Sequence, residues 1–269
     1  EKLGAKFIKF SGGEPLLRDD IGEIISYCRK RGLIVLLNSN GTLVCEKLKE
    51  IGGIEEIQIS LDGPESVHDY IRGKGTYNKV IQALESLKGL NINVVFTTVI
   101  SKYNIEFIPF ILELAEKYKV GAYFQPVTQD MSNGCGANVF SEFAPDIDGY
   151  RKAIGLLIKE KRKGNHFILH SMSGLRHLYC WPIPRSVNCI ESLVCCFMEP
   201  DSSMFVCNMF PHYERYLVNT HGRLKENFLN LSLPHPCTEC WASDVELNLL
   251  GKFKLDAMWG IWKRFCKNK

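Results

Sequence analysis

The sequence has 269 residues, a net charge of +3 and 45% hydrophobic residues. This length is sufficient for one large core, or for one core with a small satellite domain. The small positive charge comes without a basic stripe interleaved with aromatic residues, which argues against nucleic acid as a partner. No apolar run approaches the roughly 20 residues of a membrane-spanning helix, and the first residues do not resemble a signal peptide. We therefore expect a cytoplasmic protein that does not bind a membrane.

The first half of the sequence alternates between short apolar stretches and amphipathic stretches with helix caps. Strands are expected at residues 6–10, 33–37, 56–60, 91–99 and 120–126, and helices at about 20–31, 43–51, 76–88, 104–118 and 147–163. Such alternation is typical of parallel strands joined by crossover helices. The strands are rich in valine, isoleucine and phenylalanine, which is expected when both faces of a sheet are covered. We predict an α/β barrel or partial barrel, with its chemistry on the loops that follow the strands.

The sequence changes character beyond about residue 166. Prolines interrupt the periodicity, and seven of the eleven cysteines lie between Cys180 and Cys240. The chain is too long for a small secreted domain held by disulfides, so this clustering favours metal binding. Helical spacing returns at residues 246–265. We predict three parts, which are a barrel at 1–165, a small cysteine-rich domain at 166–243 and a C-terminal helix at 244–269.

Polar motifs follow three of the expected strands. They are Gly-Gly-Glu-Pro at 12–15, Asn-Ser-Asn-Gly-Thr at 38–42 and Ser-Leu-Asp-Gly at 60–63, with His-Asp-Tyr-Ile-Arg-Gly at 68–73. Two glycines let a backbone approach a ligand closely, and the adjacent Glu14 suits an ammonium group. Ser60 and Asp62 suit ribose hydroxyls, and Arg72 suits a carboxylate. The plainer interpretation is a tight Asn-Gly turn and a capped helix with a surface arginine.

In this order on successive strand ends, the motifs resemble the radical S-adenosylmethionine (SAM) superfamily. They most resemble its branch with a SPASM- or twitch-type cysteine-rich C-terminal extension, which includes peptide-modifying and cofactor-maturing enzymes. The resemblance covers about residues 6–126 and implies a TIM-like (β/α)6 barrel. It also implies roles for individual residues. Gly12, Gly13, Glu14 and Pro15 would hold the SAM amino group, Ser60 the ribose and Arg72 the carboxylate, while Asn38 and Gln125 would line the same pocket.

The sequence departs from this family at the catalytic iron–sulfur cluster. The family binds a four-iron, four-sulfur cluster through Cys-x3-Cys-x2-Cys, on the loop after the strand that precedes Gly-Gly-Glu-Pro. No such triplet occurs in the sequence, and five strands are expected where the family has six. We therefore expect a partial barrel that lacks its first strand, in an N-terminally truncated fragment that does not cleave SAM.

Four cysteines in the second half have the spacing of a metal site. Cys196 and Cys207 are followed by Cys237-x2-Cys240, and the Cys-x2-Cys spacing lets two thiolates chelate one centre. Spacing alone fits zinc as well as iron, and Cys195 is an alternative to Cys196. The resemblance favours an auxiliary four-iron, four-sulfur cluster at these four cysteines.

The resemblance implies that the intact protein cleaves SAM reductively to a 5′-deoxyadenosyl radical, which abstracts hydrogen from a substrate. The use would be peptide modification or cofactor maturation. The partners would be a peptide or small-molecule substrate and an electron donor such as a reductase, flavodoxin or ferredoxin. Cys135, after the last expected strand, is a speculative catalytic thiol.

Two alternatives stay open. One is a non-catalytic SAM-like or peptide-binding protein that has lost the catalytic cluster. The other is a zinc-stapled α/β hydrolase or transferase, although the sequence contains no nucleophile elbow or phosphate-binding loop that would support it.

Overall fold

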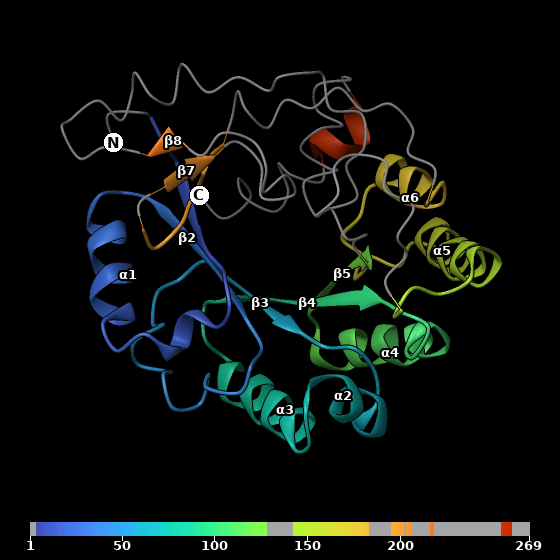
Figure 1. The fold of residues 1–269 in the computed structure, drawn as a ribbon, viewed down its shortest axis with the longest axis horizontal. Helices are drawn as coiled ribbons and strands as arrows, with labels where there is room; N and C mark the ends of the chain where they lie inside the picture. The colour runs from blue at the N-terminus through green and yellow to red at the C-terminus, as the bar shows by residue number, and fades with distance from the viewer. Residues whose placement is uncertain are drawn as a thin grey trace. The chain divides into compact units, whose positions relative to one another are not determined.

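The main feature of the fold is a five-stranded parallel sheet with the strand order β1-β2-β3-β4-β5 (Figure 1). The computed structural model describes residues 4–127, 142–182, 195–201, 203–205, 216–217 and 254–259. The strands are β1 (Phe7–Phe10), β2 (Ile34–Ser39), β3 (Glu56–Ser60), β4 (Asn93–Ile100) and β5 (Gly121–Pro126). Each strand pairs with the next one along the chain, so the sheet grows in one direction as a barrel wall does. The predicted α/β partial barrel is confirmed.

Helices cover one side of this sheet. They are α1 (Ile21–Lys30), α2 (Glu65–Arg72), α3 (Thr76–Leu87) and α4 (Ile108–Tyr118), with short 3-10 turns η1 (Pro15–Leu17) and η2 (Ile105–Phe107). The helix α1 buries Ile21, Ile25 and Cys28, whose spacing places them on one helical face. Figure 1 shows α1, α3 and α4 along the same side of the sheet. The helices expected near these positions are confirmed to within a few residues.

The expected helix at residues 43–51 is wrong. Residues 42–53 form a series of turns between β2 and β3. Two helical-type hydrogen bonds are present, from the Lys47 amide to Leu43 and from the Ile51 amide to Lys47. A segment of this length is too short to sustain a helix by itself in water. Val44 and Ile51 of this segment are buried.

The two faces of the sheet differ in polarity. In a parallel sheet, paired residues point to the same face, and neighbours along a strand point to opposite faces. One face carries the buried apolar residues of β2, β3 and β4, which are Val35, Leu37, Ile57, Ile59, Val94 and Phe96. The other face carries Lys9, Asn38, Glu56, Gln58, Ser60 and Thr97. Leu36 and Val95 on this second face are buried as well, so it combines buried apolar residues with hydrogen-bonding groups.

The chain divides into two compact units, and each is described by itself. The first comprises residues 1–124 and 164–169, and the second comprises residues 125–163 and 170–269. Within the first unit, one parallel bridge joins Ala122 of β5 to Ile168. The predicted division at residues 165 and 243 stays a prediction.

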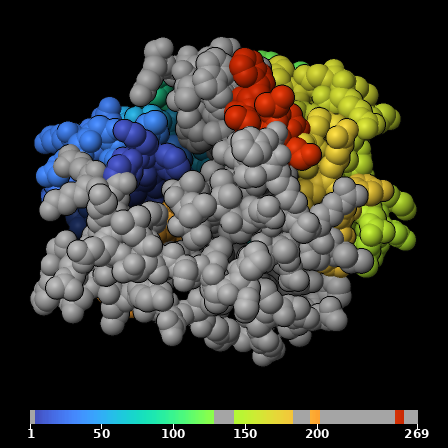
Figure 2. Space-filling model, turned by 90° about the horizontal axis from the view of Figure 1, so that it is seen from above, coloured from blue at the N-terminus to red at the C-terminus, as the bar shows by residue number. Residues whose placement is uncertain are grey.

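The second unit contains the helices α5 (Ile147–Arg162) and α6 (Met172–Leu178), and the expected helix at 147–163 is confirmed. It also contains short antiparallel strands, which are β6 (Phe197–Met198), β7 (Ser203–Phe205) and β8 (Tyr216–Leu217). The rings of Tyr150 and Trp181 are buried, and their centroids lie 4.7 Å apart. Residues 255–259 form a helical turn whose Leu255 is exposed, and this turn is visible in red in Figure 2. No helix in the described ranges is long and apolar enough to cross a membrane.

Candidate functional site

The polar motifs meet at one edge of the sheet. The loops at residues 11–14, 40–42, 61–64 and 101–104 follow the carboxyl ends of β1, β2, β3 and β4. Because these strands are parallel neighbours, their carboxyl ends lie side by side. This edge is where barrels of parallel strands bind their ligands, so we take it as the candidate site.

Glu14 joins the first two loops. Its Oε1 accepts hydrogen bonds from the Leu16 amide at 3.1 Å and from the Ser39 hydroxyl at 3.0 Å. Its Oε2 accepts a hydrogen bond from the Asn40 amide at 2.6 Å. The Leu16 contact caps the 3-10 turn η1, in which Pro15 is buried. Glu14 thus fixes the loop after β1 against the end of β2.

The Gly12-Gly13 turn has open space at the positions where side chains would extend. Both glycines are exposed, and a Cβ atom built on either one would have no neighbouring atom within 4 Å. Gly12 has a φ of +117°, which side-chain-bearing residues rarely adopt. The backbone carbonyl and amide groups of this turn are therefore accessible to a ligand.

Asn38, Ser60 and Thr97 lie on the polar face of the sheet near this edge. The Asn38 amide donates a hydrogen bond to the Ser11 hydroxyl at 3.2 Å. Ser60 is partly exposed and pairs in register with Thr97 of the neighbouring strand. The Oδ1 atom of Asn38 and the hydroxyl of Thr97 are buried without a hydrogen-bond partner in the described part of the chain. Gln125 is partly exposed at the end of β5.

Asp62 and Arg72 form an ion pair on the loop after β3. The Arg72 Nε atom donates to Asp62 Oδ2 at 2.6 Å, and the Val99 amide donates to Asp62 Oδ1 at 3.3 Å. Asp62 is 1% exposed. The expectation that Asp62 binds a ribose hydroxyl is therefore wrong, because both carboxylate oxygens are occupied by protein groups.

His68 supports this ion pair from the helix α2. Its Nδ1 atom accepts a hydrogen bond from the Asp62 amide at 3.2 Å. Burial lowers the pKa of His68, and the Arg72 charge lowers it further, while Asp62 and Asp69 act in the opposite direction. The ring is consequently neutral near pH 7, with its proton on Nε2. The role of His68 was missed from the sequence, where the motif was considered mainly for its arginine.

The predicted metal ligands are only partly within the described residues. Cys195 and Cys196 are partly buried, and burial raises the pKa of the Cys196 thiol. Cys207, Cys237, Cys240 and the speculative thiol Cys135 lie outside the described residues. Within the described ranges, no group of three potential metal ligands is present.

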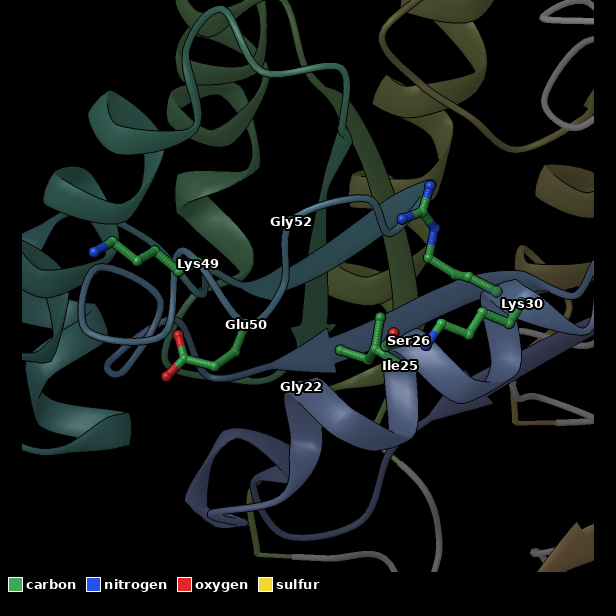
Figure 3. A pocket seen from close by; sticks show the side chains of 8 residues that line it. Gly22, Ile25, Ser26, Lys30, Lys49, Glu50 and Gly52 are labelled. Carbon is green, nitrogen blue, oxygen red and sulfur yellow. The ribbon is translucent and has the colours of Figure 1, made fainter.

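A separate hollow lies away from this edge. It is lined by Gly22, Ile25, Ser26, Arg29 and Lys30 of α1 and by Lys49, Glu50 and Gly52 from the turns before β3. Figure 3 shows Gly22, Ile25 and Ser26 facing the segment that carries Glu50 and Gly52. The hollow holds none of the motif residues, so it is not part of the candidate site.

The part of the chain that carries this edge resembles a known family. A family model described as the Radical SAM superfamily matches residues 1–115. Fe-coproporphyrin III synthase of Methanosarcina barkeri (strain Fusaro / DSM 804) is 32% identical over 168 residues, which cover 60% of this chain and 41% of that protein. Mycofactocin maturase MftC of Mycolicibacterium smegmatis is 24% identical over 221 residues, which cover 79% of this chain and 54% of that protein. The matches thus span about half the length of these curated relatives.

The fold has solved counterparts. The structure of native anSMEcpe with bound AdoMet, which is SAM, aligns with a TM-score of 0.59 at 18% sequence identity. The alignment covers 83% of this chain and 65% of that chain. At this identity the likeness concerns the fold, and it supports the partial barrel described above.

Proposed function

We propose that this chain belongs to the radical SAM superfamily, that the loops after β1 to β4 bind SAM, and that the whole protein acts as a radical SAM enzyme. The observation that supports this most directly is the open Gly12-Gly13 turn, which Glu14 holds at the carboxyl edge of the sheet. Bound SAM supplies the reactive group of this family, a 5′-deoxyadenosyl radical released on reductive cleavage, while the protein binds and orients the reactants.

The residues at this edge fit the polar groups of SAM. The carbonyl groups of Gly12 and Gly13 would accept hydrogen bonds from its ammonium group, with the negative charge of Glu14 close by. Arg72 would donate from its terminal nitrogens to the carboxylate. Ser60 would bind a ribose hydroxyl, and Asn38 would line the same pocket.

The proposal also concerns the class of substrate and the electron donor. Two of the similar proteins are named as a mycofactocin maturase and an Fe-coproporphyrin III synthase. Their similarity supports a peptide or small-molecule substrate for this chain. A reductase, flavodoxin or ferredoxin would supply the electron, since reductive cleavage requires one.

We also propose that Cys196, Cys207, Cys237 and Cys240 hold an auxiliary four-iron, four-sulfur cluster. Four thiolates with a Cys-x2-Cys pair match the ligand set of such clusters. Cys195 and Cys196 are adjacent and similarly exposed, so either thiol would serve as the first ligand.

SAM binding by the chain tests the principal proposal, with titration calorimetry as the measurement. The informative variant is Gly13→Val, because Gly13 lies outside the left-handed region and has open space where the side chain would extend. The added side chain should fill the space needed by the ligand without disturbing the fold. We expect binding at least about tenfold weaker, which corresponds to about 1.4 kcal/mol.

Gly155→Val is the matched control. Gly155 lies in α5, and a Cβ atom there also has no neighbour within 4 Å. This variant should bind SAM as the unaltered chain does, and both variants should keep their melting temperature. Equal affinity in Gly13→Val and Gly155→Val would overturn the proposed location of the site.

A further inference from the structure

Among the described residues, the contact between Asp62 and Arg72 involves the Nε atom of the guanidinium group and neither of its terminal nitrogens. Only the Nε atom of Arg72 donates to Asp62, at 2.6 Å. The Asp62 side chain is 2% exposed, whereas the Arg72 side chain is 31% exposed. A guanidinium group is planar, so fixing Nε also restricts the directions of the two terminal nitrogens. The pair therefore joins a buried anchor to a partly exposed set of donors.

Asp62 is itself held from three sides. Its Oδ1 accepts a hydrogen bond from the Val99 amide of β4, and its own amide donates to His68 of α2. The preceding residue, Leu61, accepts a hydrogen bond from the Thr98 hydroxyl at 2.6 Å. These bonds connect the loop to both neighbouring elements. Asp62 is consequently held in place, and the Arg72 side chain must take the orientation that the Asp62 carboxylate sets.

A buried carboxylate at this position is not explained by stability alone. Removing a carboxylate from water is costly, and a buried ion pair is often no more stabilising than apolar residues of similar volume. Such a pair is expected where the partly exposed side chain must point in a fixed direction. Arg72 ends the helix α2 at the edge where the Gly12-Gly13 turn and Ser60 also lie.

We propose that Asp62 is a positioning residue that fixes Arg72, and that the pair makes the site select adenosyl ligands that carry a carboxylate. This inference rests on the proposed function, because it concerns the same site. A guanidinium group held at Nε can present its terminal nitrogens to a carboxylate without first losing the freedom of a long side chain. Without Asp62, Arg72 would still carry its charge but would have to be ordered on binding.

The test compares two ligands that differ in the carboxylate, namely SAM and decarboxylated SAM. Both are titrated into the unaltered chain and into Asp62→Asn and Arg72→Lys. Lysine keeps a charge near Asp62 but lacks the planar fork. We expect the unaltered chain to prefer SAM, and both variants to lose about tenfold of that preference, or about 1.4 kcal/mol. The affinity for decarboxylated SAM should stay nearly constant.

The comparison separates positioning from a general structural role. A loop that merely unfolds would weaken the binding of both ligands together, and such a parallel loss in both variants would overturn the inference. An unchanged preference in Asp62→Asn and Arg72→Lys would overturn it as well, while leaving the proposed function intact. Failure of the unaltered chain to bind either ligand would instead overturn the proposed function, and this inference with it.

Discussion

At the scale of single residues, two carboxylates determine the shape of the sheet edge. Glu14 accepts three hydrogen bonds from Leu16, Ser39 and Asn40, and Asp62 accepts bonds from Arg72 and Val99. Each carboxylate thereby joins a loop to a neighbouring strand or helix. Hydrogen bonds to charged groups are stronger than those between neutral groups, so these two loops are held more firmly than exposed loops of the same length. A ligand at this edge would meet a preformed surface.

His68 predicts a pH dependence of stability at the same scale. Burial lowers its pKa in the folded chain below the ordinary value of about 6.5. The unfolded chain therefore takes up this proton first as the pH falls, and the contribution of His68 to stability is complete above about pH 6.5. It is lost progressively as the pH falls from there toward the folded-state pKa. Asp62, Asp69 and Arg72 are the charged groups that act on the ring.

The measurement is the free energy of unfolding in urea between pH 7.5 and pH 5, for the unaltered chain and for His68→Gln. Glutamine can accept the hydrogen bond from the Asp62 amide but does not titrate. We expect the unaltered chain to lose more stability than the variant below about pH 6.5. Identical pH profiles would show that His68 is not held neutral by burial.

At the scale of elements, the turn after β2 depends on one glycine. Gly41 has a φ of +83°, and a Cβ atom there would lie 2.9 Å from Val80 of α3 and 3.0 Å from Ile59 of β3. Gly89, after α3, has a similar φ of +77° but no atom within 4 Å of its Cβ position. Both glycines therefore have a positive φ, but only Gly41 also lacks room for a side chain.

Alanine substitution should separate these two requirements. Gly41→Ala should destabilise the fold by about 1–3 kcal/mol more than Gly89→Ala does, because overpacking adds to backbone strain. Thermal or urea unfolding of both variants gives the difference. Equal destabilisation would mean that α3 shifts without cost to make room for the added methyl group.

Most elements of the barrel could be predicted from their periodicity, and the exceptions have physical causes. The strand at Glu56–Ser60 has the bounds expected from the sequence. Its alternation, Glu-Ile-Gln-Ile-Ser, places Glu56, Gln58 and Ser60 on one face of the sheet, which the apolar composition of the strands as a group does not predict. The segment at 43–51 has helical spacing and two helical-type hydrogen bonds, but it is too short to sustain a helix by itself.

The candidate site was predictable in outline from the order of its motifs. Their position at one edge followed from parallel topology alone. The partners of individual side chains did not follow, because hydrogen bonds such as that of Asp62 with Val99 join residues far apart in the sequence. Asp62 was therefore assigned to a ligand, whereas the structure shows it bound to the protein.

At the scale of the whole molecule, the two compact units differ in how far similarity to known proteins supports their proposed roles. The family match covers residues 1–115, which lie entirely in the first unit. The cysteines proposed as metal ligands lie in the second unit, where Cys196 is the only one among the described residues. The question that involves the chain as a whole is whether the second unit binds iron, because an auxiliary cluster would bring redox chemistry to a protein whose barrel we propose to bind SAM.

Metal analysis of the whole chain answers this question. After anaerobic reconstitution with iron and sulfide, we expect about four irons and four sulfides per chain, as in a four-iron, four-sulfur cluster. Cys237→Ser and Cys240→Ser should lose this iron, because a cluster with three thiolates is held less firmly. Cys45→Ser is the matched control, since Cys45 is exposed in the first unit, where its thiol contacts Ser86. One zinc per chain without iron would replace the cluster by a structural site, and full iron content in both variants would exclude these cysteines as ligands.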